Sequence, residues 1–150
     1  MKIYLLWHAQ STFNKYKTDD IDCDLTEEGI KQAKKLEGYF DHVICSPLKR
    51  TMKTLNLSNI KYKSHEINDI CREYKIDKCD FMEGEDIVFE TKKELEDRIE
   101  KFRSYLLSLK KKSILVVTHS DFIFNFTKKI VDGEEFGVDA ENAELIEHHL

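Results

Sequence analysis

The fold is decided by the stretch Ile3-Tyr4-Leu5-Leu6-Trp7-His8-Ala9-Gln10-Ser11-Thr12-Phe13-Asn14. Its apolar first half is typical of a buried β-strand, and it stops abruptly at a histidine followed by small polar residues. In an open α/β sheet, ligands bind beyond the carboxyl ends of the strands, where rigid strands hold loops that stay open to solvent. We therefore expect His8 at the rim of such a site, although a lone histidine at a strand end is more commonly an inert, hydrogen-bonded residue.

A second strand ends in the same way. The run 113–118, Ser-Ile-Leu-Val-Val-Thr, is rich in branched apolar residues and is followed by His119. A short strand is expected over 42–45, and the Ser-Pro pair at 46–47 then predicts the start of a helix with Arg50 in its first turn. Two histidines at strand ends and an arginine at a helix start, all on one rim of the sheet, indicate a site for an anion.

Helices are expected between and after these strands. Thr26 is predicted to cap a helix whose apolar positions continue as far as Phe40, and the run 91–94 is a capping box that starts an amphipathic helix reaching Leu109. A further helix opens at Ser120. Cations stabilise the carboxyl ends of helices, so the lysine runs at 110–112 and 128–129 are expected to mark helix ends.

The rest of the chain is assigned more coarsely. Residues 61–67 suit a strand near the sheet edge, 68–90 a long, acidic, mostly irregular segment, and 144–147 a last strand after breaks at Gly133 and Gly137. The alternation of strands and helices predicts one α/β domain over residues 1–150. We expect three layers: a mostly parallel sheet with helices on both faces and right-handed crossovers.

Composition excludes several classes of function. A chain of 150 residues, 41% of them hydrophobic, is long enough for one core, and its net charge of -5 argues against a nucleic-acid partner. No apolar run approaches a membrane span or a signal peptide, so we expect a cytoplasmic protein whose four cysteines are reduced thiols. There is no glycine-rich phosphate loop, and the pair His148-His149 is not expected to bind metal because neighbouring residues of a strand point to opposite faces.

Several motifs stand in a fixed order along the chain. They are Trp7-His8-Ala9-Gln10-Ser11 with Asn14, Leu25-Thr26-Glu27-Glu28-Gly29-Ile30-Lys31-Gln32-Ala33, Ser46-Pro47-Leu48-Lys49-Arg50 with Thr54, Arg72-Glu73 followed by Glu83-Gly84, and Val116-Val117-Thr118-His119. In this order and spacing, over most of its length, the chain resembles the histidine phosphatase superfamily, also called phosphoglycerate mutase-like. Members of that family open with Arg-His-Gly, so Trp7 stands here where the family has arginine.

The resemblance implies a phosphoglycerate mutase-like fold and a phosphatase that needs neither metal nor cofactor. It implies that His8 attacks phosphorus to give a phosphohistidine, and that Glu73 gives a proton to the leaving group and later activates water. It also implies which groups meet the charge on the phosphoryl oxygens: Arg50, His119 when protonated, Ser11, Asn14 and the single N–H of Trp7.

Trp7 leaves three interpretations open. Loss of one preorganised donor commonly lowers a rate by about 10²–10³-fold. The first interpretation is a working phosphatase for a small phosphomonoester or a phosphorylated protein. The second is a catalytically weak or inactive relative that binds a phosphorylated ligand or protein partner. The third is a phosphoglycerate mutase, which is less favoured because so short a chain has little room to close over the intermediate.

The acidic run 77–90 is expected to repel polyanionic substrates if it overhangs the site. Substrate and oligomeric state stay open.

Overall fold

The protein is built around a five-stranded sheet with the strand order β3-β2-β4-β1-β7. The computed structural model describes residues 1–150. In chain order the strands of this sheet are Lys2–Trp7 (β1), Glu37–Cys45 (β2), Asn59–Ile67 (β3), Ile114–Thr118 (β4) and Leu145–His149 (β7). Neighbouring strands are parallel except β7, which pairs with β1 in the antiparallel direction. The predicted, mostly parallel sheet is confirmed.

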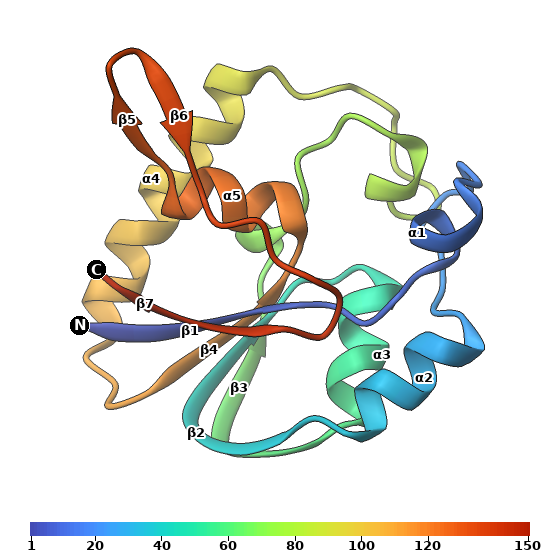
Figure 1. Cartoon of the computed structure of the whole chain (residues 1–150), viewed down its shortest axis with the longest axis horizontal. Coiled ribbons are helices and arrows are strands. Elements are labelled where there is room, and N and C mark those ends of the chain that lie inside the picture. The colour runs from blue at the N-terminus through green and yellow to red at the C-terminus, as the bar shows by residue number, and fades with distance from the viewer.

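Helices cover both faces of this sheet. They span Thr12–Tyr16 (α1), Glu27–Lys34 (α2), Lys49–Leu57 (α3), Lys92–Leu109 (α4) and Ser120–Thr127 (α5). In Figure 1, α4 and α5 lie on one side of the sheet, and α2 and α3 lie on the other. This is the three-layer arrangement that the alternation of elements predicted.

Alternate side chains of the central strands fill two separate cores. Ile3 and Leu5 of β1, with Val116 of β4, pack in a cluster with the apolar residues of α4 and α5. Leu6 and Val117 point the other way and pack in a cluster that includes α3. Because both faces of β1 and β4 are covered, these strands are almost continuous apolar runs, and apart from Lys2 at the start of β1 the polar residues come at or just after their carboxyl ends.

The helix predicted to follow Thr26 is shorter than expected. Thr26 does cap α2, by accepting a hydrogen bond from the backbone N–H of Gly29, but the helix ends at Lys34 and not near Phe40. Phe40 belongs to β2, where it is buried on the α3 side of the sheet. Gly38 lies between them with φ of 142°, a conformation incompatible with a helix, so the i, i+4 spacing of the apolar residues here was misleading.

The helix after β2 begins at Lys49, two residues later than the Ser-Pro pair predicted. Ser46 is fully buried at the end of β2, and Leu48 occupies the N-cap position without a side-chain cap of its own. The carboxylate of Asp22, from a distant loop, accepts a hydrogen bond of 2.8 Å from the backbone N–H of Lys49 instead. Arg50 still lies in the first turn, so its expected place at the sheet rim is confirmed.

The second half of the chain follows the predictions closely, with one exception. The capping box at Thr91 and Glu94 starts α4, and Lys110 and Lys128 are the C-cap residues of α4 and α5. The segment 68–90 is irregular apart from two short 3₁₀ turns, Asp69–Cys71 and Lys78–Asp80. The hairpin of Lys129–Val131 (β5) and Glu134–Phe136 (β6) was not predicted, although the Asp-Gly pair at its turn, both residues at positive φ, is a hairpin signal.

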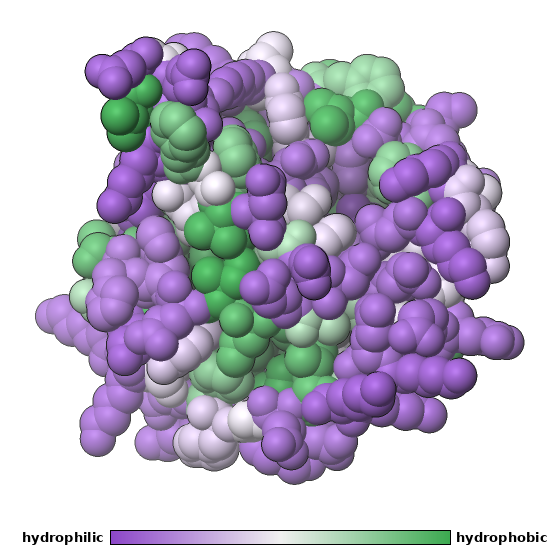
Figure 2. All heavy atoms as spheres, viewed as in Figure 1, coloured by the Kyte–Doolittle hydropathy of each residue, from purple (hydrophilic) through white to green (hydrophobic).

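The surface of the protein is mostly hydrophilic. Figure 2 shows that apolar residues reach the surface on this face in a strip near the middle of the view, around the β5–β6 hairpin and in a patch at the upper right. No helix has both the length and the apolar character needed to cross a membrane.

At Gly29, helix α2 lies in close contact with the backbone of the loop after β1, and we predict that this position tolerates no larger residue. A Cβ atom at this position would lie 2.1 Å from the carbonyl oxygen of Gln10, which is a main-chain atom and cannot move aside cheaply. We expect Gly29→Ala to lower the free energy of unfolding by about 1–3 kcal/mol, the usual cost of overpacking. Denaturant unfolding of the wild type and the variant measures this difference in free energy. Lys31→Ala, at an exposed position of the same helix, is the control; equal stability of the two variants would contradict the contact.

Candidate active site

A small cavity lies at the carboxyl ends of β1 and β4. Its volume is about 70 Å³. Six of the seven residues predicted from the sequence line it: Trp7, His8, Ser11, Asn14, Arg50 and Glu73. The seventh, His119, is fully buried behind His8, with the two imidazole centroids 5.2 Å apart. The strand and helix ends therefore converge as the sequence predicted.

The orientation of the His8 ring is fixed by its own strand end. Nδ1 lies 2.7 Å from the carbonyl oxygen of Ala9, and since a carbonyl only accepts, Nδ1 carries the proton of the neutral ring. The lone pair is then on Nε2. That atom accepts hydrogen bonds from the indole N–H of Trp7 at 3.1 Å and from Nε–H of Arg50 at 3.2 Å.

Burial keeps His8 neutral. The ring is almost fully buried, and this desolvation, with the nearby positive charge of Arg50, holds the pKa of His8 well below its ordinary value of 6.5. A neutral imidazole with an unprotonated Nε2 is a nucleophile. At physiological pH the geometry of His8 is therefore that of a nucleophile and not of a cationic phosphate ligand.

Arg50 is held by a residue that the sequence did not single out. Its Nη2 donates to the carboxylate of Asp80 at 3.0 Å, and its Nη1 donates to the carbonyl of Cys79 at 2.7 Å. Both partners of this ion pair are only 4% exposed. The other carboxylate oxygen of Asp80 accepts from the backbone N–H groups of Ile76 and Asp77, which fixes the turn that carries it. The one cation of the cavity is therefore already paired.

Glu73 faces the cavity as a buried acid. Its carboxyl oxygens accept hydrogen bonds from the backbone N–H groups of Tyr74 at 2.8 Å, Phe122 at 2.9 Å and Asp121 at 3.1 Å. Burial is the main cause that raises its pKa, to about 8, and the negative charges of Asp121 and Asp80 add to it. Glu73 is consequently protonated at neutral pH, which is the state a proton donor needs.

His119 differs from the expectation of a protonated phosphate ligand. Its Nε2 lies 2.9 Å from the hydroxyl of Ser46, while its Nδ1 is buried without a partner. Burial, with the charge of Arg50 and the neighbouring His8, holds the pKa of His119 well below the ordinary value. The ring is therefore neutral in the free protein, because burial penalises the imidazolium and the guanidinium of Arg50 repels it.

Ser11 and Asn14 are used partly for local structure. Ser11 is the N-cap of α1, and the Oδ1 atom of Asn14 accepts from both the backbone N–H and the hydroxyl of Ser11 at 2.9 Å. Asn142, from the loop before β7, donates to Asn14 Oδ1 and to the carbonyl of His8, each at 3.1 Å. Asn142 ties the loop before β7 to His8, and no pattern near it in the sequence predicts that contact.

The charge around the cavity is mostly negative. Besides Glu73, the carboxylates of Asp77, Asp80 and Asp121 line it, against the single guanidinium of Arg50. Burial and the charges of Asp77 and Asp139 raise the pKa of Asp121. The acidic run 77–90 reaches the cavity only at its start, through Asp77, Cys79 and Asp80, whereas Glu83 is exposed and does not line the cavity. The pair Glu83-Gly84, matched to the family motif, is not at the site.

Known proteins resemble the chain in sequence pattern and in fold. The sequence matches the family model of the histidine phosphatase superfamily (branch 1) over residues 3–137. The structure superposes on a candidate alpha-ribazole-5'-P phosphatase from Escherichia coli K-12 with a TM-score of 0.66 and 21% sequence identity, covering 84% of this chain and 77% of that one. It also superposes on a phosphoglycerate mutase from Thermus thermophilus with a TM-score of 0.65 and 19% identity, covering 98% and 92%.

A third solved structure, the open reading frame Rv3214 from Mycobacterium tuberculosis, gives a TM-score of 0.61 at 19% identity, covering 83% of this chain and 77% of that one. No curated protein matches the sequence significantly. At these identities the superpositions show a shared phosphoglycerate mutase-like fold, and the sequence match adds the family. The chain belongs to the histidine phosphatase superfamily.

Proposed function

We propose that the chain is a metal-independent phosphatase that hydrolyses a phosphomonoester through a phosphohistidine on His8. The observation that carries the proposal is the pairing, across one cavity, of a neutral His8 whose Nε2 lone pair faces inward with a protonated Glu73. The substrate is a small phosphate ester or a phosphorylated protein side chain. Residues 1–150 form one such domain, working in a reducing compartment such as the cytoplasm, where its four free cysteines are stable.

The reaction follows from the positions of these two groups. Nε2 of His8 attacks phosphorus in line, the bond from phosphorus to the ester oxygen breaks, and the proton of Glu73 passes to the leaving oxygen. The Glu73 carboxylate then takes a proton from water. The resulting hydroxide attacks phosphorus, the N–P bond breaks, and inorganic phosphate and neutral His8 are restored.

Trp7 and Arg50 have a specific part in this scheme. In the free site their N–H groups are engaged by the lone pair of His8 Nε2. When that lone pair forms the bond to phosphorus, both donors become free to bind the phosphoryl oxygens, which carry the developing charge. Trp7 supplies one neutral N–H where family members have an arginine, so stabilisation of that charge is weaker.

The second candidate function is a catalytically weak or inactive family member that binds a phosphorylated ligand or a protein partner. The buried pairing of Arg50 with Asp80 favours it, because the Asp80 carboxylate already occupies Nη2 of Arg50 and leaves mainly Nε–H for a phosphoryl group. Nothing favours the third interpretation, a phosphoglycerate mutase. Chain length, however, does not exclude it, since this chain covers 92% of the structure from Thermus thermophilus that is named a mutase.

The first test is hydrolysis of an aryl phosphate in the presence of a chelator. We expect activity in the wild type, none in His8→Ala, and a phosphorylated protein trapped by acid quench only where His8 is present. Trp7→Arg should raise the rate, by up to the roughly 10²-fold that one charged donor contributes. His65→Ala, on the exposed face of β3, is the control for loss of an imidazole. A silent wild type that Trp7→Arg activates would favour the binding function.

The pH dependence of kcat/KM tests the state of Glu73. The reaction needs Glu73 protonated, and its pKa of about 8 means that kcat/KM falls as pH rises through 8. His8 must be neutral, and its low pKa keeps it so into the acidic range. For an alkyl phosphate we therefore expect a plateau at acidic to neutral pH and an alkaline fall. Asp121→Asn, which removes a negative neighbour, should move the fall to lower pH; an alkaline plateau in the wild type would rule out Glu73 as the acid.

The acidic lining makes a prediction about substrates. A second phosphate near Asp77 or Asp121 adds like-charge repulsion of about 1 kcal/mol per close pair in water, or roughly fivefold in binding. We expect a sugar bisphosphate to be turned over with a lower kcat/KM than a simple alkyl monophosphate, and Asp77→Asn to narrow the gap. Steady-state kinetics at low and high salt measure the ratio of kcat/KM between the two substrates. Glu28→Gln, at an exposed position of α2, controls for net charge. Equal turnover of the two substrates would refute the effect.

A further inference from the structure

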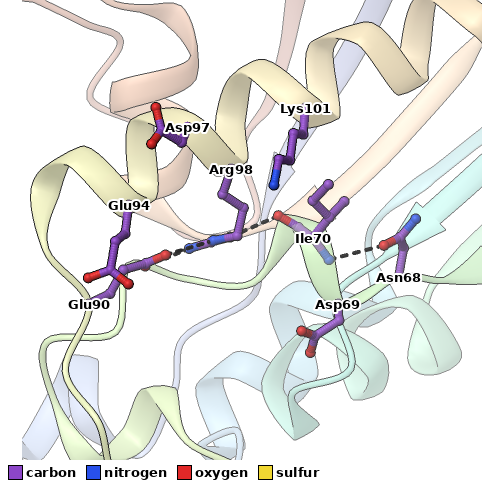
Figure 3. A pocket seen from close by; sticks show the side chains of 8 residues that line it. All are labelled: Asn68, Asp69, Ile70, Glu90, Glu94, Asp97, Arg98 and Lys101. Carbon is purple, nitrogen blue, oxygen red and sulfur yellow. Dashed lines mark hydrogen bonds and ion pairs between the residues drawn. The ribbon is translucent and has the colours of Figure 1, made fainter.

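A second, larger cavity lies outside the site, between the start of α4 and the 3₁₀ turn Asp69–Cys71. Its volume is about 590 Å³, and none of the residues predicted for catalysis lines it. Figure 3 shows that Arg98 projects from α4 into this region and bridges the carboxylate of Glu90 and the main chain at Ile70. Arg98, which lines this cavity, also contacts the main chain of the segment that carries Glu73.

Arg98 binds that segment through its main chain. Nη1 donates to the carbonyl oxygens of Ile70 at 2.8 Å and Arg72 at 2.7 Å, and Nη2 donates to the carbonyl oxygen of Glu73 itself at 3.2 Å. Nε and Nη2 donate to the two carboxylate oxygens of Glu90 at 2.9 and 2.8 Å. These hydrogen bonds occupy the full donor capacity of a guanidinium, and three of them hold the residues that end at the proposed acid.

Glu90 holds the same segment from its other end. Its backbone N–H donates to the carbonyl of Lys75 at 2.9 Å, and its Oε1 accepts from the backbone N–H of Lys75 at 3.3 Å. The side chain is 9% exposed, and that of Arg98 is 17% exposed. Arg98 and Glu90, here called the clasp, therefore fix the main chain on both sides of Glu73.

The clasp replaces the backbone pairing that this part of the chain lacks. Residues 72–77 belong to no helix or strand, so no ladder of main-chain hydrogen bonds fixes them. The carboxyl group of Glu73 nevertheless meets the N–H groups of Asp121 and Phe122 at hydrogen-bond distance. Arg98 also stands over the ring of Phe122, 5.5 Å from its centroid, so it contacts both the segment with the acid and the helix that receives it.

We propose that Arg98 and Glu90 are positioning residues that hold Glu73 where it can give its proton to the leaving group. The inference rests on the proposed function, in which Glu73 is the acid. The clasp touches neither substrate nor phosphorus and acts only through the placement of the Glu73 carboxyl. Its loss should therefore weaken proton donation and leave nucleophilic attack by His8 nearly unchanged.

Two esters separate these effects. An aryl phosphate leaves as a stable phenolate and needs little help from an acid, whereas an alkyl phosphate leaves as a strongly basic alkoxide and needs the proton. The constant kcat/KM reports the step that forms the phosphohistidine, in which the leaving group departs. A defect in proton donation thus appears in kcat/KM for the alkyl ester, and general structural damage lowers both esters together.

The experiment compares Arg98→Met, Glu90→Gln and Arg98→Lys with Arg103→Met on both esters. Arg103 is the matched control, because it lies on α4, donates to the carbonyl of Phe126 at 3.0 Å and stands over the Phe126 ring, away from Glu73. We expect Arg98→Met to lower kcat/KM for the alkyl ester by about 10–100-fold, part of the roughly 10²–10⁴-fold that acid catalysis supplies. The aryl ester should change by less than about threefold, as should both esters in the control.

The variants distinguish the outcomes. Arg98→Lys should recover part of the alkyl activity, because one ammonium can still reach a carbonyl but cannot form the whole set of bonds. If Arg98→Met does not fold, as judged by circular dichroism, Glu90→Gln carries the same test, since it keeps shape and loses the charge pair. Equal losses on both esters, or no loss, in folded variants would overturn the clasp alone. A wild type inactive on both esters would instead overturn the proposed function, and the clasp with it.

Discussion

The site depends on one hydrogen bond, from Nδ1 of His8 to the carbonyl oxygen of Ala9. A neutral imidazole has one N–H, and placing it at 2.7 Å from a carbonyl leaves the lone pair of Nε2 toward the cavity. The carbonyl can serve this purpose because its peptide cannot move. The N–H of that same peptide, from Gln10, donates to Oε1 of Gln32 on α2 at 2.9 Å, and the N–H of the fully buried Ala9 donates to the hydroxyl of Thr54 on α3 at 2.9 Å. One residue earlier, the N–H of His8 continues the pairing of β1 with β4 by donating to Thr118.

Burial favours the uncharged form of both His8 and Glu73, although one is a base and the other an acid. Removing water penalises the charged form, which is the cation for His8 and the anion for Glu73. The pKa of His8 therefore falls and that of Glu73 rises, so at neutral pH both are uncharged. The protonation states that the proposed nucleophile and the proposed proton donor need thus have one physical cause. Beside them, the buried charges of Arg50 and Asp80 form an ion pair.

Local patterns in the sequence predicted the strands of the central sheet, the helices α2 to α5 and the residues at their ends, but not the short helix α1 or the β5–β6 hairpin. His8 and Arg50 were found because each follows a strand or opens a helix, and these ends must meet at one rim of a parallel sheet. Contacts between distant residues left no such mark: Asn142 and His8 are 134 positions apart. In the irregular segment 68–90, carboxylates are so frequent that the sequence did not show which of them point inward. Asp80 and Glu90 were therefore missed.

The wrong assignments also arose because a local pattern does not show the folded conformation. The helix predicted to reach Phe40 followed the apolar spacing past Gly38, and the positive φ of Gly38 is visible only in the folded chain. Glu83-Gly84 likewise matched a motif by letters, but Glu83 is exposed.

Trp7 and Asp80 together decide how the site can treat a phosphoryl group. The indole N–H offers one hydrogen bond without charge, and the guanidinium of Arg50 is held by a carboxylate that is itself anchored by two backbone N–H groups. Separating a buried ion pair leaves a carboxylate uncompensated unless it takes up a proton or another donor replaces the arginine. Burial raises the pKa of Asp80, whereas the neighbouring guanidinium of Arg50 lowers it. A phosphoryl group that binds the Nη groups of Arg50 therefore competes with a carboxylate that two backbone N–H groups hold in place. The neutral N–H of Trp7 adds no charge to offset that competition.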